Sequence, residues 1–312
     1  MAIPVAANER SEYFGTIVSQ ATPVVDFIGK NKTEATASQR VQFDYDDQGQ
    51  LIRIRYYQNG VLTNLPRIGA AEVRIEYTGH QEVRTYWDAS GNPDFLWRIC
   101  YRGLNFATEG KVHKEVFTLD GKGRRVALDL FDEKDEPAET YYGSDHYSWT
   151  WLDNETVIEK RTGRNAHSIP LTHFFDFERT RISFDDLGIH WLIENIDAEG
   201  ILTNGRISKT ASVRFEYNTD LNEADYSFYN AQDRIAERGA YGPMPFGFAR
   251  ITNTFSDDGR LLEEVYRDRF NQLVNNSAGF ARAVYDYDEN GTFKGTRFLS
   301  TNGDELEYRR PY

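Results

Sequence analysis

Histidines and carboxylates gather in one stretch of the chain, residues 141–191, and they are the residue types of general acid–base catalysis. His167, His173 and His146 lie there together with Asp176. Histidine exchanges a proton near neutral pH, and a neighbouring carboxylate can orient its ring. If the chain is an enzyme, these four residues are its candidate catalytic groups, and we expect lyase, cyclase or hydrolase chemistry on a small molecule.

Aromatic side chains accumulate in the same stretch and suggest how a ligand would be held. Ligand sites are lined mainly by apolar and aromatic side chains with a few polar anchor points. The candidate ligand-binding residues are Tyr147, Trp149, Trp151, Phe175 and Trp191. The spacing of two between Tyr147, Trp149 and Trp151 is also typical of the buried face of a β-strand, so core packing is the competing interpretation.

The sequence carries none of the motifs that mark common catalytic or cofactor sites. It has no phosphate-binding loop, no dinucleotide fingerprint, no Gly-x-Ser-x-Gly elbow and no His-Glu-x-x-His pair. The gap of six between His167 and His173 fits no compact metal motif. We therefore expect no cofactor and no metal.

The charge balance limits the partners of the chain. Its formal net charge is −13 over 312 residues, whereas binding to nucleic acid or to anionic lipid needs a basic surface. We expect neither nucleic acid nor membrane as a partner, which leaves a small molecule, a peptide or a glycan. The oligomeric state stays open. The chain starts without a signal peptide, lacks an apolar run of about 20 residues and has one cysteine, Cys100, so we expect a cytoplasmic protein.

The elements that would position these side chains follow from an internal repeat. A basic residue precedes a glycine by nine positions at Arg40 and Gly49, and again at Arg282 and Gly291. The other starts, some of them without the glycine, are Arg74, Lys114, His146, Arg179, Arg214 and Arg250. The starts are about 32 to 40 residues apart, a period typical of repeat proteins. Eight repeats therefore fill the chain from Arg40 onward.

Each repeat has the pattern of a β-hairpin. Apolar residues alternate with polar ones after the basic residue, as in Val41, Phe43 and Tyr45, which places them on one face of a strand. An Asp-x-x-Gly turn follows, in which aspartate accepts backbone hydrogen bonds and glycine supplies the left-handed conformation. A second apolar strand and a looser turn complete the repeat. The aromatic content of 14% also favours strands.

These patterns predict an all-β protein of about eight antiparallel β-hairpin repeats, with roughly sixteen strands in one long curved sheet. We expect this sheet to be rolled or closed around an aromatic interior. Residues 40–312 are expected to form the repeat domain as a single cooperative body. Residues 1–39 lack the repeat, and we expect them to form a short N-terminal capping segment that helps to cover the aromatic face.

Two short segments carry a resemblance to a known family. Tyr45–Gly49 and Tyr287–Gly291 both read Tyr-Asp-x-x-Gly, and Phe184–Gly188 is a close variant. In this motif the chain resembles the Rhs/YD-repeat proteins, as a short, diverged relative with the pattern detectable over residues 40–308. The resemblance implies a β-sheet shell built from such repeats, which in that family can enclose a cargo polypeptide.

Three functions are compatible with the sequence. The favoured one is a binding or scaffold protein that presents an aromatic-lined face or cavity to a peptide, glycan or small apolar ligand. The alternative is a small-molecule enzyme with its active site inside the β-shell around residues 141–191, which requires two of the histidines in one cavity with a carboxylate. The third is an assembly module, which requires long, uncharged edge strands.

Overall fold

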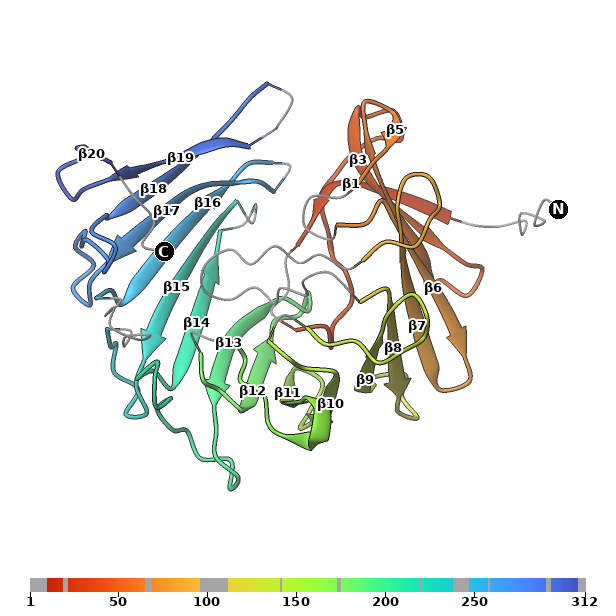
Figure 1. Ribbon diagram of the computed structural model, residues 1–312, viewed down its shortest axis with the longest axis horizontal. Coiled ribbons are helices and arrows are strands. Elements are labelled where there is room, and N and C mark those ends of the chain that lie inside the picture. Colours follow the sequence, from red (N-terminus) through yellow and green to blue (C-terminus); the bar gives the residue numbers. More distant parts are fainter. Residues whose placement is uncertain are drawn as a thin grey trace. The chain divides into compact units, whose positions relative to one another are not determined.

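The regular structure of the chain, in a computed structural model, consists of antiparallel β-strands (Figure 1). The structure describes residues 10–18, 22–64, 69–95, 112–140, 142–172, 175–218, 220, 222–237, 247–257, 259–289 and 293–307. Within these ranges the strands are β1 (Arg10–Ile17), β2 (Gly29–Lys32), β3 (Gln39–Tyr45), β4 (Leu51–Gln58), β5 (Val61–Leu62), β6 (Glu72–Thr78), β7 (Gln81–Trp87), β8 (Lys114–Leu119), β9 (Arg125–Phe131), β10 (His146–Trp151), β11 (Thr156–Thr162), β12 (Arg179–Phe184), β13 (His190–Asn195), β14 (Ser212–Tyr217), β15 (Glu223–Tyr229), β16 (Arg250–Phe255), β17 (Leu261–Arg267), β18 (Arg282–Tyr287), β19 (Phe293–Leu299) and β20 (Glu305–Leu306). A single 3-10 turn, η1 (Arg164–Ala166), is the helical element of the described chain, and no described helix is long and apolar enough to cross a membrane.

The eight predicted repeats coincide with eight pairs of consecutive strands in the described ranges. Each predicted start lies in the first strand of a pair, and the starts at Lys114, His146, Arg179, Arg250 and Arg282 are the first residues of β8, β10, β12, β16 and β18. Seven of the pairs are antiparallel hairpins by their register: β3–β4, β6–β7, β8–β9, β12–β13, β14–β15, β16–β17 and β18–β19. β10 and β11 form the fourth pair of consecutive strands along the chain. The expected all-β array of hairpins is confirmed.

The chain divides into two compact units, each with its own series of strands. The first unit comprises Met1–Trp151 with Lys160–Ile169, and the second comprises Leu152–Glu159 with Pro170–Tyr312. In the first unit the pairing order is β2–β1–β3–β4–β6–β7–β8–β9–β10, with β5 on β4. In the second unit consecutive strands pair from β12 to β20. No pair among the described strands joins the two ends of either series, so the closed arrangement considered from the sequence is not formed within them.

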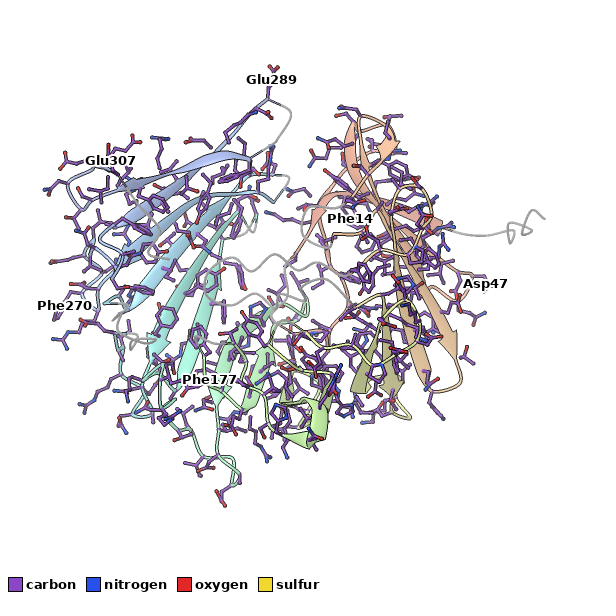
Figure 2. All side chains as sticks on the ribbon, in the orientation of Figure 1. Phe14, Asp47, Phe177, Phe270, Glu289 and Glu307 are labelled. Carbon is purple, nitrogen blue, oxygen red and sulfur yellow. The ribbon has the colours of Figure 1, made fainter. Side chains whose placement is uncertain are left out.

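Part of the predicted capping segment joins the sheet. β1 pairs antiparallel with β3, from Arg10↔Tyr45 to Phe14↔Val41, and β1 also pairs with β2. The rings of Phe14 and Phe43 meet edge-on, with centroids 5.1 Å apart (Figure 2). β1 therefore extends the first series beyond the repeats, and residues 22–28 lie between β1 and β2.

The tight turns have the predicted chemistry. In the first repeat the Asp46 carboxylate accepts hydrogen bonds from the backbone N–H groups of Gln48 and Gln50, at 2.9 and 2.8 Å. Gly49 closes this turn with a φ of +81°. The turns that begin at Asp120 and Asp185 repeat these bonds. The glycine of the last repeat, Gly291, lies outside the described residues.

The turn after the second strand has the same geometry, although the sequence predicts a looser one. Asp132 accepts hydrogen bonds from the backbone N–H groups of Lys134 and Glu136, at 2.8 and 3.0 Å, and Asp135 takes the left-handed position with a φ of +64°. The equivalent left-handed residues are Gly91, Gly200, Asp233, Asn271 and Gly303. Aspartate and asparagine tolerate this conformation better than other side chains. The turn therefore persists in repeats where its glycine is replaced.

A β-bulge accompanies the tight turn that has a glycine as its fourth residue, as in Asp-x-x-Gly. The register shifts by one residue after the turn in β3–β4, β8–β9, β12–β13, β16–β17 and β18–β19. In β6–β7 and β14–β15, whose turns lack Asp-x-x-Gly, the register is continuous. The bulge leaves one residue of the second strand without a partner across the hairpin, which is Trp191 in β13 and Leu262 in β17.

The basic residue that opens a repeat packs over an aromatic ring of the same hairpin. The guanidinium carbon of Arg40 lies 4.3 Å from the centroid of the Tyr57 ring, and that of Arg214 lies 4.0 Å from the Tyr229 ring. Arg74 on Trp87 and Lys114 on Phe131 are equivalent pairs. At exposed sites such a contact stabilises by about 0.5–1 kcal/mol. In these four repeats, packing within the hairpin therefore explains the basic residue.

A column of aromatic side chains forms the core of the second unit. The ring centroids are 4.6 to 6.0 Å apart along the series Phe177, Phe175, Phe228, Phe248, Tyr266, Phe280 and Phe298 (Phe177 is labelled in Figure 2). A buried alanine before the first strand links neighbouring repeats. Ala249, for example, donates its backbone N–H to the carbonyl oxygen of Arg267, and its own carbonyl oxygen accepts the backbone N–H of Phe228. The repeats are thus joined by both backbone bonds and ring contacts.

Candidate functional site

The predicted acid–base residues belong to different parts of the fold. His146 and His167 lie in the first unit and Asp176 in the second, while His173 lies outside the described residues. His146 on β10 is directly opposite Asp129 on β9, and its Nδ1 lies 2.7 Å from the Asp129 Oδ1. His146 therefore has a carboxylate partner, although Asp129 is not one of the predicted residues, and the enzyme hypothesis requires a second histidine in the same cavity.

Asp176 and His167 make local contacts that hold loops. The Asp176 carboxylate accepts hydrogen bonds from the backbone N–H groups of Ile207 and Ser208, at 2.7 and 3.1 Å. Burial acts to raise the pKa of Asp176, but these two N–H donors outweigh burial and hold the pKa below its ordinary value. His167 is exposed, and its Nδ1 lies 2.6 Å from the carbonyl oxygen of Arg164. Asp176 is thus an ionised loop anchor.

His190 is buried in an apolar environment. Its ring packs edge-on against Phe215 at 4.4 Å between centroids, and its Nε2 lies 3.2 Å from the Tyr217 hydroxyl. Burial lowers the pKa of His190 to about 3. The imidazole is therefore neutral at ordinary pH and its conjugate acid is not available near neutrality.

Three of the five predicted ligand-binding aromatic residues lie together in the first unit. Tyr147 and Trp149 are buried and stacked, with centroids 5.9 Å apart, and Trp149 stacks on Phe117 at 6.3 Å. The indole N–H of Trp151 donates to the carbonyl oxygen of Arg125 at 2.8 Å. The other two lie in the second unit, Phe175 inside the aromatic column and Trp191 with 44% of its surface exposed.

No cluster of three or more histidine, cysteine, aspartate or glutamate side chains with metal-binding geometry occurs among the described residues. Cys100 lies outside them.

A buried group of charged side chains on β7 and β9 is the strongest candidate for a functional site. Glu82 and Arg84 alternate along β7 and share the face of Tyr86, and Arg125 starts β9. All of these side chains are almost fully buried, with Arg84 1% and Arg125 5% exposed. Charged groups are seldom buried unless they are paired, because removal from water is costly. The carboxylates that pair with Arg84 and Arg125 therefore define the site.

Both arginines bind the carboxylate of Asp26, a residue that does not belong to a strand. Arg84 donates to the Glu82 Oε1 at 2.6 Å and to the Asp26 Oδ1 at 2.9 Å. Arg125 donates to both Glu82 oxygens, at 2.8 to 3.0 Å, and also to the Asp26 Oδ1. Asp26 belongs to the segment between β1 and β2, and 67% of its side chain is exposed. The arginine pair is therefore capped by a carboxylate that itself faces solvent.

Aromatic rings and backbone groups complete the arrangement. Both guanidinium groups lie over the buried Phe117 ring, Arg125 at 4.4 Å and Arg84 at 4.9 Å, and Arg84 also lies 4.6 Å from Phe27. Arg125 donates a further hydrogen bond to the carbonyl oxygen of Pro23 at 3.2 Å. Residues 22–28 therefore contact the site through a carboxylate, a ring and a backbone carbonyl. Trp149 stacks on Phe117, so one of the predicted ligand-binding residues packs against the ring that contacts both arginines.

The electrostatics of the site depend on Asp26. Burial lowers the pKa of Arg84, but Glu82 and Asp26 raise it above its ordinary value, so the guanidinium is charged. Loss of solvent raises the pKa of Asp26, but the coulombic attraction of Arg125 and Arg84 outweighs it and lowers the pKa below its ordinary value. Glu115 lies directly opposite Arg84 on β8 and is also buried, so Glu82, Glu115, Asp26 and the two arginines together carry one net negative charge. Without Asp26 this group would be neutral, and Arg84 and Arg125 would each lose one hydrogen-bond acceptor that another carboxylate could replace.

Sequence reasoning missed this site because the inward positions of β7 carry the charges. Val83 is the β-branched residue that alternation would place in the core, yet Glu82, Arg84 and Tyr86 are the buried ones. The available signal was the spacing of two between Glu82 and Arg84, since ion-pair partners on one strand face recur at that interval.

The comparisons with known proteins give a loose likeness to other β structures. No protein-family model and no curated protein matches the chain. Similar solved structures include a porin-like protein from Bacteroides uniformis ATCC 8492, with 14% identity over 88% of this chain and 90% of that chain and a TM-score of 0.24. The Photorhabdus luminescens Tc holotoxin pore is similar at 13% identity over 86% of this chain, which spans 14% of that chain, with a TM-score of 0.19. At these TM-scores neither likeness carries an argument about the fold or the function of this chain.

Proposed function

We propose that the chain is a β-repeat binding scaffold that holds a carboxylate-bearing polypeptide segment at Arg84 and Arg125. The observation that carries this proposal is the docking of residues 22–28 on the inward face of β7 to β9, with Asp26 between the two arginines. In this proposal Asp26 is an internal stand-in for the aspartate or glutamate of a peptide ligand. The site belongs to the peptide branch of the favoured sequence-based hypothesis, and the glycan and apolar-ligand branches have no equivalent support.

The chemistry of the site fits a peptide carboxylate. A guanidinium presents its N–H donors in a fork that matches the two oxygens of a carboxylate, and burial strengthens such bonds. An aromatic residue next to the carboxylate would extend the Arg84 contact, as Phe27 does for Asp26. The resemblance to Rhs/YD-repeat proteins, whose shells can enclose a cargo polypeptide, is consistent with an inward-facing peptide site and forms part of this proposal.

The test uses a synthetic peptide with the sequence of residues 22–28 and a second peptide in which its aspartate is replaced by asparagine. Both are labelled and titrated against the Asp26→Ala chain, with fluorescence anisotropy as the measurement. We expect the aspartate peptide to bind at least about tenfold more tightly than the asparagine peptide, because removal of one partner from a buried charge pair costs about 2 kcal/mol or more. We also expect the aspartate peptide to raise the midpoint of thermal unfolding of this variant.

The matched control is Asp47→Ala, which removes an exposed carboxylate at a turn far from the arginines in sequence and leaves Asp26 in place (Asp47 is labelled in Figure 2). This variant should bind the aspartate peptide more weakly than Asp26→Ala does, because its site is already occupied. Equal binding of the two peptides to Asp26→Ala, or equal affinity of the two variants for the aspartate peptide, would refute the proposal.

A further inference from the structure

Two neighbouring hairpin tips of the second unit expose three apolar side chains. Leu152 lies at the turn before β11, Leu187 in the turn between β12 and β13, and Trp191 at the bulge of β13, with exposed fractions of 55, 70 and 44%. The backbone N–H of Phe184 donates to the carbonyl oxygen of Glu155 at 2.8 Å, so the two tips are adjacent. We call Leu152, Leu187 and Trp191 the tip surface; the neighbouring strands β11, β12 and β13 are green in Figure 1.

The tight turn does not need an apolar residue at the position of Leu187. Leu187 is the third residue of its Asp-x-x-Gly turn, where the equivalent turns carry Gln48 and Lys122. The turn is already held by the backbone bonds of Asp185. Trp191 takes the bulge position, which carries Ile52, Val126 and Leu262 in three other repeats and a lysine, Lys294, in the last. Bulges re-aim side chains near functional sites, and exposed tryptophan with neighbouring leucines is typical of protein interaction surfaces.

The rim of the tip surface is acidic. Asp153, Glu155, Asp185 and Asp186 are all exposed in the same two turns, and neither 152–156 nor 185–190 contains lysine or arginine. Arg181 on β12 is engaged by Glu194, with 2.6 Å between its Nε and the carboxylate oxygen. A negative rim attracts a basic partner and repels nucleic acid and anionic lipid. Apolar anchors inside an acidic rim therefore select a partner with apolar side chains flanked by lysine or arginine.

We propose that the tip surface docks a basic amphipathic segment of a partner polypeptide. Leu152, Leu187 and Trp191 supply the apolar contact, and the four carboxylates pair with lysine or arginine around it. This proposal uses none of the residues of the arginine pair, so it does not depend on the function proposed above. It also gives Trp191 a ligand-binding role through the outer tip of a hairpin, in place of the enclosed pocket expected from the sequence.

The test uses a short helical peptide made of leucine and lysine, and a matched peptide of leucine and glutamate, titrated by isothermal calorimetry. The full chain should bind the lysine peptide and not the glutamate peptide, with an affinity that falls as salt rises. Leu187→Ser combined with Trp191→Ser should weaken binding by at least about tenfold, because buried aromatic anchors dominate such interfaces. Glu155→Gln combined with Asp186→Asn should weaken binding less and reduce its salt dependence.

The control is Leu262→Ser, which changes the equivalent bulge position in another repeat, where the side chain is 36% exposed. It should leave binding unchanged, and all variants should keep the wild-type midpoint of thermal unfolding. Unchanged binding after Leu187→Ser with Trp191→Ser, or equal binding of the two peptides, would overturn the proposal. Sedimentation that shows the chain dimerising, with the dimer lost in the same double variant, would instead assign the surface to a second copy and equally overturn it.

Discussion

The role of His190 is determined by its environment in the fold. In the sequence it is one of four histidines between residues 141 and 191, with nothing to separate it from the others. In the fold it starts β13 on the inward face, and only 4% of its surface is exposed. The ring packs against Phe215 and pairs with the Tyr217 hydroxyl. A buried neutral imidazole is a structural group, and it makes the second unit sensitive to acid.

The sign of this effect follows from the two pKa values of His190. Burial lowers the pKa in the folded chain to about 3, whereas an unfolded histidine has a pKa of about 6.5. The unfolded chain therefore takes up a proton first, and the free energy of unfolding falls as the pH drops from about 6.5 toward about 3, by about 1.4 kcal/mol per pH unit. Urea unfolding at pH 7 and pH 5 should show this loss in the wild type and not in His190→Gln. The same pH dependence in both chains would contradict the assignment.

At the scale of the element, the hairpin turns are the part of the fold that sequence reasoning recovers best. Period-two alternation and Asp-x-x-Gly locate the strand pairs because both reflect local backbone chemistry. The tight geometry of the turn after the second strand escapes the same reasoning in three repeats, because Asp135, Asp233 and Asn271 stand where glycine would mark it. The arginine pair escapes it as well, because Arg84 and Arg125 belong to different repeats and only the sheet brings them to Asp26. The sequence pattern of one repeat does not predict its contacts with another repeat.

The turn between β8 and β9 offers a matched pair of glycines for testing this account. Gly123 has a φ of +79°, while Gly121 is outside the left-handed region, and a Cβ at either position would meet no atom within 4 Å. Gly123→Ala should destabilise the fold by about 1 kcal/mol or more, because the left-handed conformation is costly for a residue with a Cβ. Gly121→Ala should be neutral or slightly stabilising. Urea unfolding of the two variants measures the difference, and equal stabilities would show that the backbone of Gly123 does not limit this turn.

At the scale of the whole molecule, the strands at the ends of the two strand series test the assembly hypothesis, which requires long, uncharged edge strands. β2, at one end of the first series, has four residues, Gly-Lys-Asn-Lys, and β20 at the end of the second has two. Short and charged edge strands discourage pairing with a further chain. The edges at β2 and β20 therefore do not meet the requirement set for an assembly module, and a binding scaffold remains the function that we propose.

The central claim is that residues 22–28 occupy a site that another polypeptide can take. Hydrogen–deuterium exchange of the wild-type chain, with and without a saturating amount of the peptide that copies residues 22–28, tests it most directly. The account predicts faster amide exchange in residues 22–28 when the peptide is present, because the peptide carboxylate displaces Asp26 from Arg84 and Arg125, while the amides of β7 stay protected. If the peptide binds and the exchange of residues 22–28 does not change, the two do not share a site and the claim is wrong.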